Sequence, residues 1–277
     1  MILLFILWTG FWNHSGQLFA QKSPVKYFGG AYQTYTLKAE GVKFKVFDLN
    51  VSNRRVKAQY FGQAAKKRYD AWRKRGRKRI LCCFSVGFVK DYEHNTPLGL
   101  CADDGRVLNR ALEPSMDGLV TVRPGGKPSA FDIGQDQWNG RYTLRSTSER
   151  VAFLKVIEQK GLSLFQTQLL YSYADSLKMS PNAKGKKASR RLLAICMDAT
   201  GREHHLVLNV ISSARLYEAA VAAIIALKEK GFWVRYLLNQ DTGSRDIMDA
   251  FDDQKKRIYS APVPMSEATQ LLVYYYE

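Results

Sequence analysis

The sequence predicts an α+β fold, a single domain in which helices flank one large mixed β-sheet. Three observations predict it. Short apolar segments separated by Gly, Pro, Asn and Asp recur along the chain, as is typical of strands and turns. Residues 214–231 have helical periodicity and stand between two strand-like segments, which indicates a C-terminal βαβ unit. No repeat and no long linker interrupts residues 21–277, so one domain is expected there.

The first 20 residues differ in character from the rest. MILLFILWTGFW is apolar but short for a membrane span, and NHSGQLFA follows it, with Ala20 suited to be the last residue before cleavage. This pattern predicts a signal peptide over residues 1–20 and a secreted or periplasmic protein with no membrane span after cleavage. An uncleaved membrane anchor is the alternative.

The amino-terminal half is predicted to be mainly strands. Two are expected within residues 32–53, where the apolar phase slips by one residue and indicates a bulge or a change of neighbours. A basic helix follows and ends at Gly76. The later elements expected here are a buried strand at 80–89 and hairpins that turn at 103–105 and 124–126.

The carboxy-terminal half alternates strands with helices. The elements expected are a strand at 141–148, a helix at 148–161 closed by Gly161, a strand at 162–173, a surface loop at 179–187 and a strand pair turning at Thr200-Gly201. The βαβ unit then has Ser213 and Gly231 as the caps of its helix. Its strands, at about 205–211 and 232–239, should be parallel with a right-handed crossover.

The charge balance points to an anionic partner. The formal net charge is +17, and nine Lys or Arg fall between Lys66 and Arg79. Tyr69 and Trp72 recur there at helical spacing with Ala65, so they are expected on a buried face and not free to stack on bases. The charge therefore predicts an anionic partner without choosing its kind, and nucleic acid is not expected. A solvated helix face is the plain alternative.

The cysteines and histidines predict no metal site. Cys82, Cys83, Cys101 and Cys196 lack the spacing of zinc ligands, and His204 and His205 are adjacent, so they point to opposite faces of a strand. A disulfide from Cys82 or Cys83 to Cys101 is one alternative for an exported protein, and small buried thiols are the favoured one. No cofactor can be named from the sequence.

An unusually polar segment ends the last strand of the βαβ unit. Asp241, Thr242, Gly243, Ser244, Arg245 and Asp246 follow FWVRYLLNQ directly. Ligands of α/β sheets bind beyond the carboxyl ends of strands, and a Thr-Gly-Ser turn exposes backbone N–H groups that can hold phosphate. A plain polar turn is the alternative.

Four blocks, in this order along residues 33–250, resemble the phosphodiester glycosidase family. They are ILCCFSVGF with TPLGLCADDGRVLN, then SLFQTQLLYSY, then Arg190 or Arg191 before LLAICMDATG, and finally LNQDTGSRD. The last block is similar to the family's Asn-Leu-Asp-Gly-Gly-Gly-Ser signature, with Asn239, Asp241 and Gly243 in place. Ser85 stands where the family has Asn, before the retained Gly87, and Thr242 stands where it has Gly.

The resemblance implies an exported hydrolase that cleaves a sugar-1-phosphodiester, and so a phosphorylated carbohydrate or other anionic glycan as its partner. A catalytically inactive relative, acting as an envelope or anionic-polymer-binding module, is the alternative. Asp241 is the candidate general base, or orients the sugar, and Asp246 is its rival in catalysis. Guanidinium groups suit phosphate, which makes Arg191 and Arg245 candidate clamps. The other substrate-binding candidates are Ser85, Gly87, Gln166, Gln168, Asn239, Thr242, Gly243 and Ser244.

Overall fold

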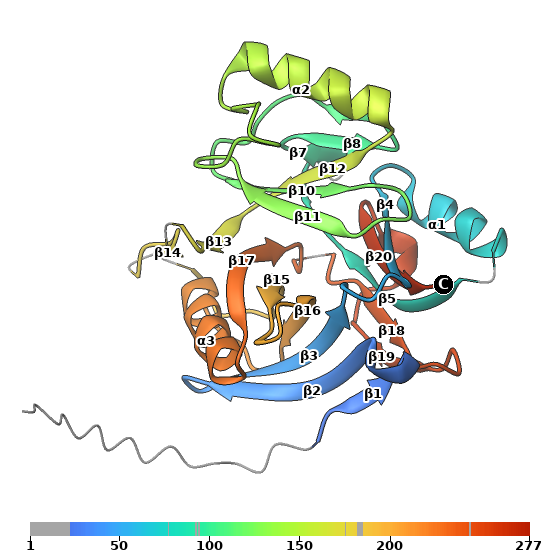
Figure 1. The fold of residues 1–277 in the computed structure, drawn as a ribbon, viewed down its shortest axis with the longest axis vertical. Helices are drawn as coiled ribbons and strands as arrows, with labels where there is room; N and C mark the ends of the chain where they lie inside the picture. The colour runs from blue at the N-terminus through green and yellow to red at the C-terminus, as the bar shows by residue number, and fades with distance from the viewer. Residues whose placement is uncertain are drawn as a thin grey trace, which may run out of the picture.

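The computed structural model describes residues 23–277 except 77, 92, 94, 175, 182–184 and 244. The expected signal peptide at 1–20 lies outside the described residues. The α+β class is confirmed, but the strands form sheets of eight, five and five strands and a two-stranded ribbon rather than one large sheet (Figure 1). The expected mixed sheet is also wrong, because every strand pair within the described residues is antiparallel.

The eight-stranded sheet holds both the first strands and the strands expected for the βαβ unit. In spatial order its strands are β1 (Val25–Tyr27), β2 (Tyr32–Ala39), β3 (Val42–Asn50), β16 (Glu203–Val210), β15 (Arg191–Met197), β17 (Trp233–Gln240), β13 (Leu169–Ser172) and β14 (Ser176–Leu177). A short 3₁₀ turn, Phe28–Gly30, joins β1 to β2. The phase slip in β3 is not a bulge, since its register with β2 is continuous. Val46 and Phe47 are instead buried on opposite faces, each in a different core.

The βαβ prediction is correct in that its two strands run parallel, but these strands are not neighbours in the sheet. Helix α3 (Leu216–Glu229) connects β16 to β17, and these strands run parallel because each is antiparallel to β15, which lies between them. Strand β15 takes that place through its hairpin with β16 at Thr200-Gly201. Alanines on α3 let the helix pack closely on the sheet. The cap of α3 is Arg215 rather than Ser213.

The first five-stranded sheet is covered by the basic helix. Its strands, in spatial order, are β19 (Arg257–Ser260), β18 (Met248–Phe251), β5 (Arg79–Ser85), β20 (Leu271–Tyr276) and β4 (Val56–Phe61). Helix α1 (Ala65–Lys74) buries Ala65 and Tyr69 against this sheet and leaves most of its basic residues exposed, as predicted. A short 3₁₀ turn, Met265–Glu267, precedes β20.

The second five-stranded sheet carries helix α2 (Thr147–Lys160) on one face, as Figure 1 shows at the top of the molecule. Its strands, in spatial order, are β11 (Pro128–Asp132), β10 (Gly118–Val122), β12 (Ser163–Thr167), β8 (Cys101–Asp103) and β9 (Arg106–Asn109). Both predicted hairpins are present as β8–β9 and β10–β11. The strand expected at 141–148 is wrong, because Ser146 caps α2 there.

Two segments expected to be continuous strands are divided. The strand expected at 80–89 becomes β5 and then β6 (Phe88–Asp91), which pairs with β7 (Thr96–Leu98) as the ribbon. The strand expected at 162–173 changes sheets at Gln168, with β12 before it and β13 after it.

A central core lies where the three sheets meet. Phe84, Phe165 and Leu238, one from each sheet, belong to this core. The four cysteines are buried as free thiols, so the disulfide alternative is not realised. Within the described part of the chain, no helix has the length and apolar character that crossing a bilayer requires.

Candidate functional site

Most of the predicted site residues lie where the eight-stranded sheet meets the first five-stranded sheet. Ser85 ends β5, Arg191 begins β15, and Gln240 ends β17 as the cross-strand neighbour of Arg191. The loop of residues 241–247 then leads from β17 to β18, which pairs with β5. Strand pairing therefore brings together residues that are more than 150 positions apart in the sequence.

Arg191 is the structural centre of this site. Only 1% of the residue is exposed. Its Nε donates to Oδ1 of Asn209 at 2.9 Å, its Nη1 to the carbonyl of Ile247 at 2.8 Å, and its Nη2 to Oδ1 of Asp246 at 2.6 Å. Burial lowers the pKa of this guanidinium, and the Asp246 carboxylate opposes that shift. Arg191 thus holds the loop from inside, and phosphate could reach it only by displacing these partners.

Ser85 fixes the same loop from the other sheet. Its hydroxyl oxygen lies 2.8 Å from the carbonyl oxygen of Asp241 and 2.6 Å from that of Arg245, so it can donate to either. Gly87 has a φ of +64°, and a Cβ there would lie 2.9 Å from Cδ of Gln270 and closer still to Oε1. Ser85 therefore holds the loop through its carbonyl groups, whereas Gly87 occupies a backbone position that favours glycine and lies against Gln270.

Asp241 is the buried carboxyl group of this loop. The residue is 6% exposed, and Oδ1 accepts one hydrogen bond, from the Gly243 N–H at 3.3 Å. Burial raises the pKa of Asp241, although the Gly243 N–H and the charges of Arg191 and Arg245 oppose the shift. Asp246 differs because it forms the ion pair with Arg191. The two carboxylates therefore have distinct environments, a pattern typical of acid–base sites.

The end of β17 carries buried polar atoms without partners. Oδ1 of Asn239 and both amide atoms of Gln240 are buried and have no hydrogen-bond partner among the described residues. The Asn239 Nδ2 donates to Oε1 of Gln168 at 3.2 Å, so Gln168 does reach this strand end. Consecutive side chains on a strand point to opposite faces, so these unsatisfied atoms lie on both sides of β17. Such groups call for a ligand or ordered water.

The remaining loop residues lie nearer the surface. Thr242 donates from its hydroxyl to the Ser189 carbonyl at 3.3 Å, and Gly243 is exposed. The Arg245 guanidinium donates to the carbonyl of Glu267 and to Oδ1 of Asn95, and so ties the loop to neighbouring segments. Ser244 lies outside the described residues.

Gln166 is not brought to this site. Its Oε1 accepts from the backbone N–H groups of Leu100 and Glu113, both at 3.0 Å, and its Nε2 donates to the Glu113 carbonyl at 2.8 Å. The amide is thereby committed to holding residues 100–116. It differs from Gln168 because the chain changes sheets between the two residues.

Two residues beside Arg191 were not predicted. Asn209 accepts from Arg191 and donates from Nδ2 to Sδ of Met248 at 3.1 Å. Tyr259, on β19, has a pKa raised by burial and by the charge of Asp246, while Arg191 and Asn209 oppose the rise. The polar Asn209 within the apolar run HHLVLNVI was an available signal, whereas Tyr259 had none.

The two histidines lie away from this loop. Nδ1 of His204 is 2.7 Å from Oδ1 of Asp48, and Nδ1 of His205 is 2.8 Å from the Tyr274 hydroxyl. No group of three His, Cys, Asp or Glu residues among those the structure describes is arranged to hold a metal ion.

Comparison with known proteins finds a shared fold. No family model matches the chain, and neither does any curated protein. A structure of a hypothetical protein from Synechocystis aligns with a TM-score of 0.51 at 12% identity, over 89% of this chain and 62% of its own. The catalytic domain of zebrafish N-acetylglucosamine-1-phosphodiester α-N-acetylglucosaminidase, auto-inhibited by its pro-peptide, aligns with a TM-score of 0.50 at 11% identity, over 92% and 81%. This chain thus spans less than two thirds of the Synechocystis protein and has a distant structural relationship to both.

Proposed function

We propose that this chain is a hydrolase that cleaves a sugar-1-phosphodiester, and that it acts after export from the cytoplasm. The observation that carries the proposal is the cluster at the end of β17, where a buried carboxyl group with a raised pKa, Asp241, adjoins polar atoms without partners. The fold shared with the zebrafish glycosidase catalytic domain supports the substrate class. Export is inferred from the apolar segment and cleavage pattern of residues 1–20.

The chemistry needs little more than a base and groups that hold the substrate. Water attacks the anomeric carbon, the bond from that carbon to the phosphate oxygen breaks, and a phosphomonoester leaves with the electron pair. Phosphate is a good leaving group, so protonation by a carboxylic acid matters less than in ordinary glycoside hydrolysis. A raised pKa makes the ionised Asp241 a stronger base toward that water.

The other candidates take supporting roles in this mechanism. Arg245 is half-buried and is the cation of the loop that can approach the phosphodiester, whereas the exposed Gly243 uses its N–H to hold the Asp241 carboxylate. Arg191 acts as a positioning residue, because its guanidinium is buried under Asp246 and Ile247. The Thr242 hydroxyl faces Ser189, and its side chain narrows the approach to the loop.

The test is turnover of sugar-1-phosphodiesters by the purified protein and by two matched variants. Asp241→Asn should lower kcat by about 10²–10⁴-fold, the usual contribution of a general base. Asp253→Asn, in the exposed turn between β18 and β19, should leave kcat unchanged. Full activity of Asp241→Asn would remove the assigned base. Absence of turnover by the folded wild-type protein would favour the alternative, an inactive relative that serves as a binding module.

A further inference from the structure

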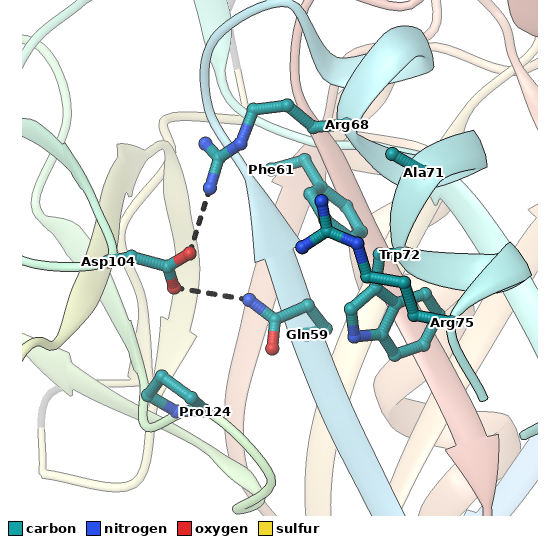
Figure 2. A pocket seen from close by; sticks show the side chains of 8 residues that line it. All are labelled: Gln59, Phe61, Arg68, Ala71, Trp72, Arg75, Asp104 and Pro124. Atoms are coloured by element: carbon teal, nitrogen blue, oxygen red, sulfur yellow. Dashed lines mark hydrogen bonds and ion pairs between the residues drawn. The ribbon is translucent and has the colours of Figure 1, made fainter.

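A cavity of about 330 Å³ opens beside the basic helix, away from the loop of residues 241–247 (Figure 2). Helix α1 forms one wall with Arg68, Trp72 and Arg75, and Gln59 and Phe61 of β4 line the cavity between the walls. Figure 2 shows Asp104 and Pro124 on the opposite side, facing α1. This volume lies at the low end of the range for ligand pockets, roughly 300–1,000 Å³, which suits a ligand of one sugar unit.

The Asp104 side of the cavity is held in place by a network. The carboxylate of Asp104 accepts from Nη2 of Arg68 at 2.8 Å and from Nε2 of Gln59 at 3.2 Å. The other end of the Arg68 guanidinium donates to the buried carboxylate of Asp103. Two carboxylates therefore offset the charge of Arg68, while the Asp104 oxygens keep lone pairs that can accept from a ligand hydroxyl.

The opposite wall offers donors that the protein does not use. The exposed side chain of Arg75 makes no hydrogen bond or ion pair with any residue that the structure describes, and Figure 2 shows its guanidinium directed into the cavity. The indole nitrogen of Trp72 also points toward the cavity and has no partner among those residues. Edge-to-face contacts hold the Trp72 ring in this orientation, with its ring centroid 5.7 Å from that of Phe61 and 5.0 Å from that of Tyr275.

We propose that this cavity binds one acidic sugar unit, a sugar ring that carries a single anionic group. This group pairs with Arg75, whose guanidinium can bind carboxylate or phosphate through two parallel hydrogen bonds. The ring hydroxyl groups accept from the Trp72 indole and donate to Asp104. This site would bind its ligand whether or not the chain hydrolyses phosphodiesters, so it goes beyond the proposed function.

The arrangement disfavours simpler ligands. A bare anion would bring its charge close to the Asp104 carboxylate, and a neutral sugar would leave the Arg75 guanidinium without a counter-charge. A nucleobase needs an open aromatic face, but Nζ of Lys78 lies 4.7 Å from the centre of the Trp72 ring and covers one face, and the indole presents its N–H edge to the cavity. A hydroxylated ring with one negative group can bind the Asp104 carboxylate through its hydroxyl groups and Arg75 through its negative group.

The exposed residues of α1 extend the site beyond one unit. Lys67, Arg73 and Lys74 are exposed on the same helix and can attract neighbouring units of an acidic glycan. That attraction is general and screened by salt, with a Debye length near 8 Å at physiological ionic strength. The contact with Arg75 inside the cavity is what separates specific binding from this background.

The experiment measures binding of four ligands by calorimetry and by the indole N–H resonance of Trp72, which a Trp72→Phe spectrum assigns. The ligands are glucuronate, glucose 6-phosphate, glucose and inorganic phosphate. At least one of the two acidic sugars should bind and shift the Trp72 resonance, and which of them binds identifies the anionic group. Glucose lacks the charge-assisted hydrogen bond to Arg75, and phosphate lacks the hydrogen bonds of the ring hydroxyl groups to Trp72 and Asp104. Each should therefore bind at least about 10-fold more weakly.

Matched variants of α1 separate the cavity from the general charge of the helix. Arg75→Gln should weaken binding of the acidic sugar about 10-fold or more, whereas Arg73→Gln, on the same helix but outside the cavity lining, should change it less than about twofold. Equal weakening by both variants would overturn the proposal, as would phosphate binding as tightly as the sugar phosphate, or no binding of either acidic sugar. Binding is read without turnover, so these outcomes are distinct from failure of hydrolysis at Asp241.

Discussion

Replacing Arg191 with methionine should destabilise the protein by about 3 kcal/mol. Methionine keeps much of the aliphatic length but removes the guanidinium. This leaves the Asp246 carboxylate and the Asn209 amide oxygen without that donor, while the Ile247 carbonyl still accepts from the Ser85 N–H. Breaking a buried ion pair from one side costs about 3–5 kcal/mol. The lower end applies because the Asp246 side chain is 16% exposed and can regain some water.

Equilibrium unfolding in urea measures this cost, and the adjacent residue provides the control. Arg190 is only half-buried and donates to the Lys186 carbonyl, so Arg190→Met should change the unfolding free energy by about 0.5 kcal/mol or less. Asp246→Asn should lower the free energy of unfolding much less in the Arg191→Met variant than in the wild-type protein, which corresponds to a coupling energy of about 1–3 kcal/mol. Equal costs for the two arginine variants, or strict additivity with Asp246→Asn, would refute a central role for Arg191.

Two further predictions concern stability. Burial alone would lower the pKa of His204, but the hydrogen bond and charge of Asp48, together with Asp198, raise it above the ordinary value of 6.5. The protonated His204 therefore stabilises the fold below pH 6.5, and this stabilisation is lost as pH rises through the raised pKa. Burial lowers the pKa of His205, although Glu203 opposes this shift. The neutral His205 therefore stabilises the fold above pH 6.5, and this stabilisation is lost as pH falls through the lowered pKa. Urea unfolding at about pH 5.5 and about pH 8 tests both signs. His204→Gln should lower the free energy of unfolding more at the lower pH, and His205→Gln should lower it more at the higher pH. The same pH dependence for both variants would contradict these opposite pKa shifts. In the same assay, Gly87→Ala should lower the free energy of unfolding more than Gly140→Ala. Both glycines have a positive φ, which costs an alanine about 1–2 kcal/mol. Only at Gly87 does the new Cβ also meet Gln270, whose side chain accepts from the Tyr60 hydroxyl. Similar losses for both would show that Gln270 moves aside at little cost.

Turn and cap chemistry made much of the fold predictable. The hairpins at Asp104-Gly105 and Gly125-Gly126 formed where expected, because Asp104, Gly105 and Gly125 adopt the positive φ values that their turns need. The start of α2 was missed although the sequence contains its signal. Ser146 accepts from the Glu149 N–H, the pattern of a capping box, but the alternation of Tyr142 and Leu144 favoured a strand.

Long-range placement was not predictable from local pattern. Residues 162–173 contain no Gly, Pro, Asn or Asp, so no turn residue marks the change of sheets that separates Gln166 from Gln168. The position of β15 between β16 and β17 depends on which strands pair, and spacing does not decide that. The end of β17 was predicted as a site from its polar residues, whereas the burial of Arg191 beneath it could not be, since arginine at a strand end is usually solvated.

The position of β20 has a consequence for how the chain folds. This strand, Leu271–Tyr276, is the last in sequence order, yet it lies between β4 and β5, pairing Leu271 with Phe61 and with Ser85. The sheet therefore remains open at its centre until about two hundred intervening residues have been synthesised. Contacts of such high sequence separation slow folding and leave strand edges exposed in the meantime. During synthesis, β4 and β5 would be vulnerable to pairing with other chains, and the Lys- and Arg-rich α1 between them is placed to discourage it by charge repulsion.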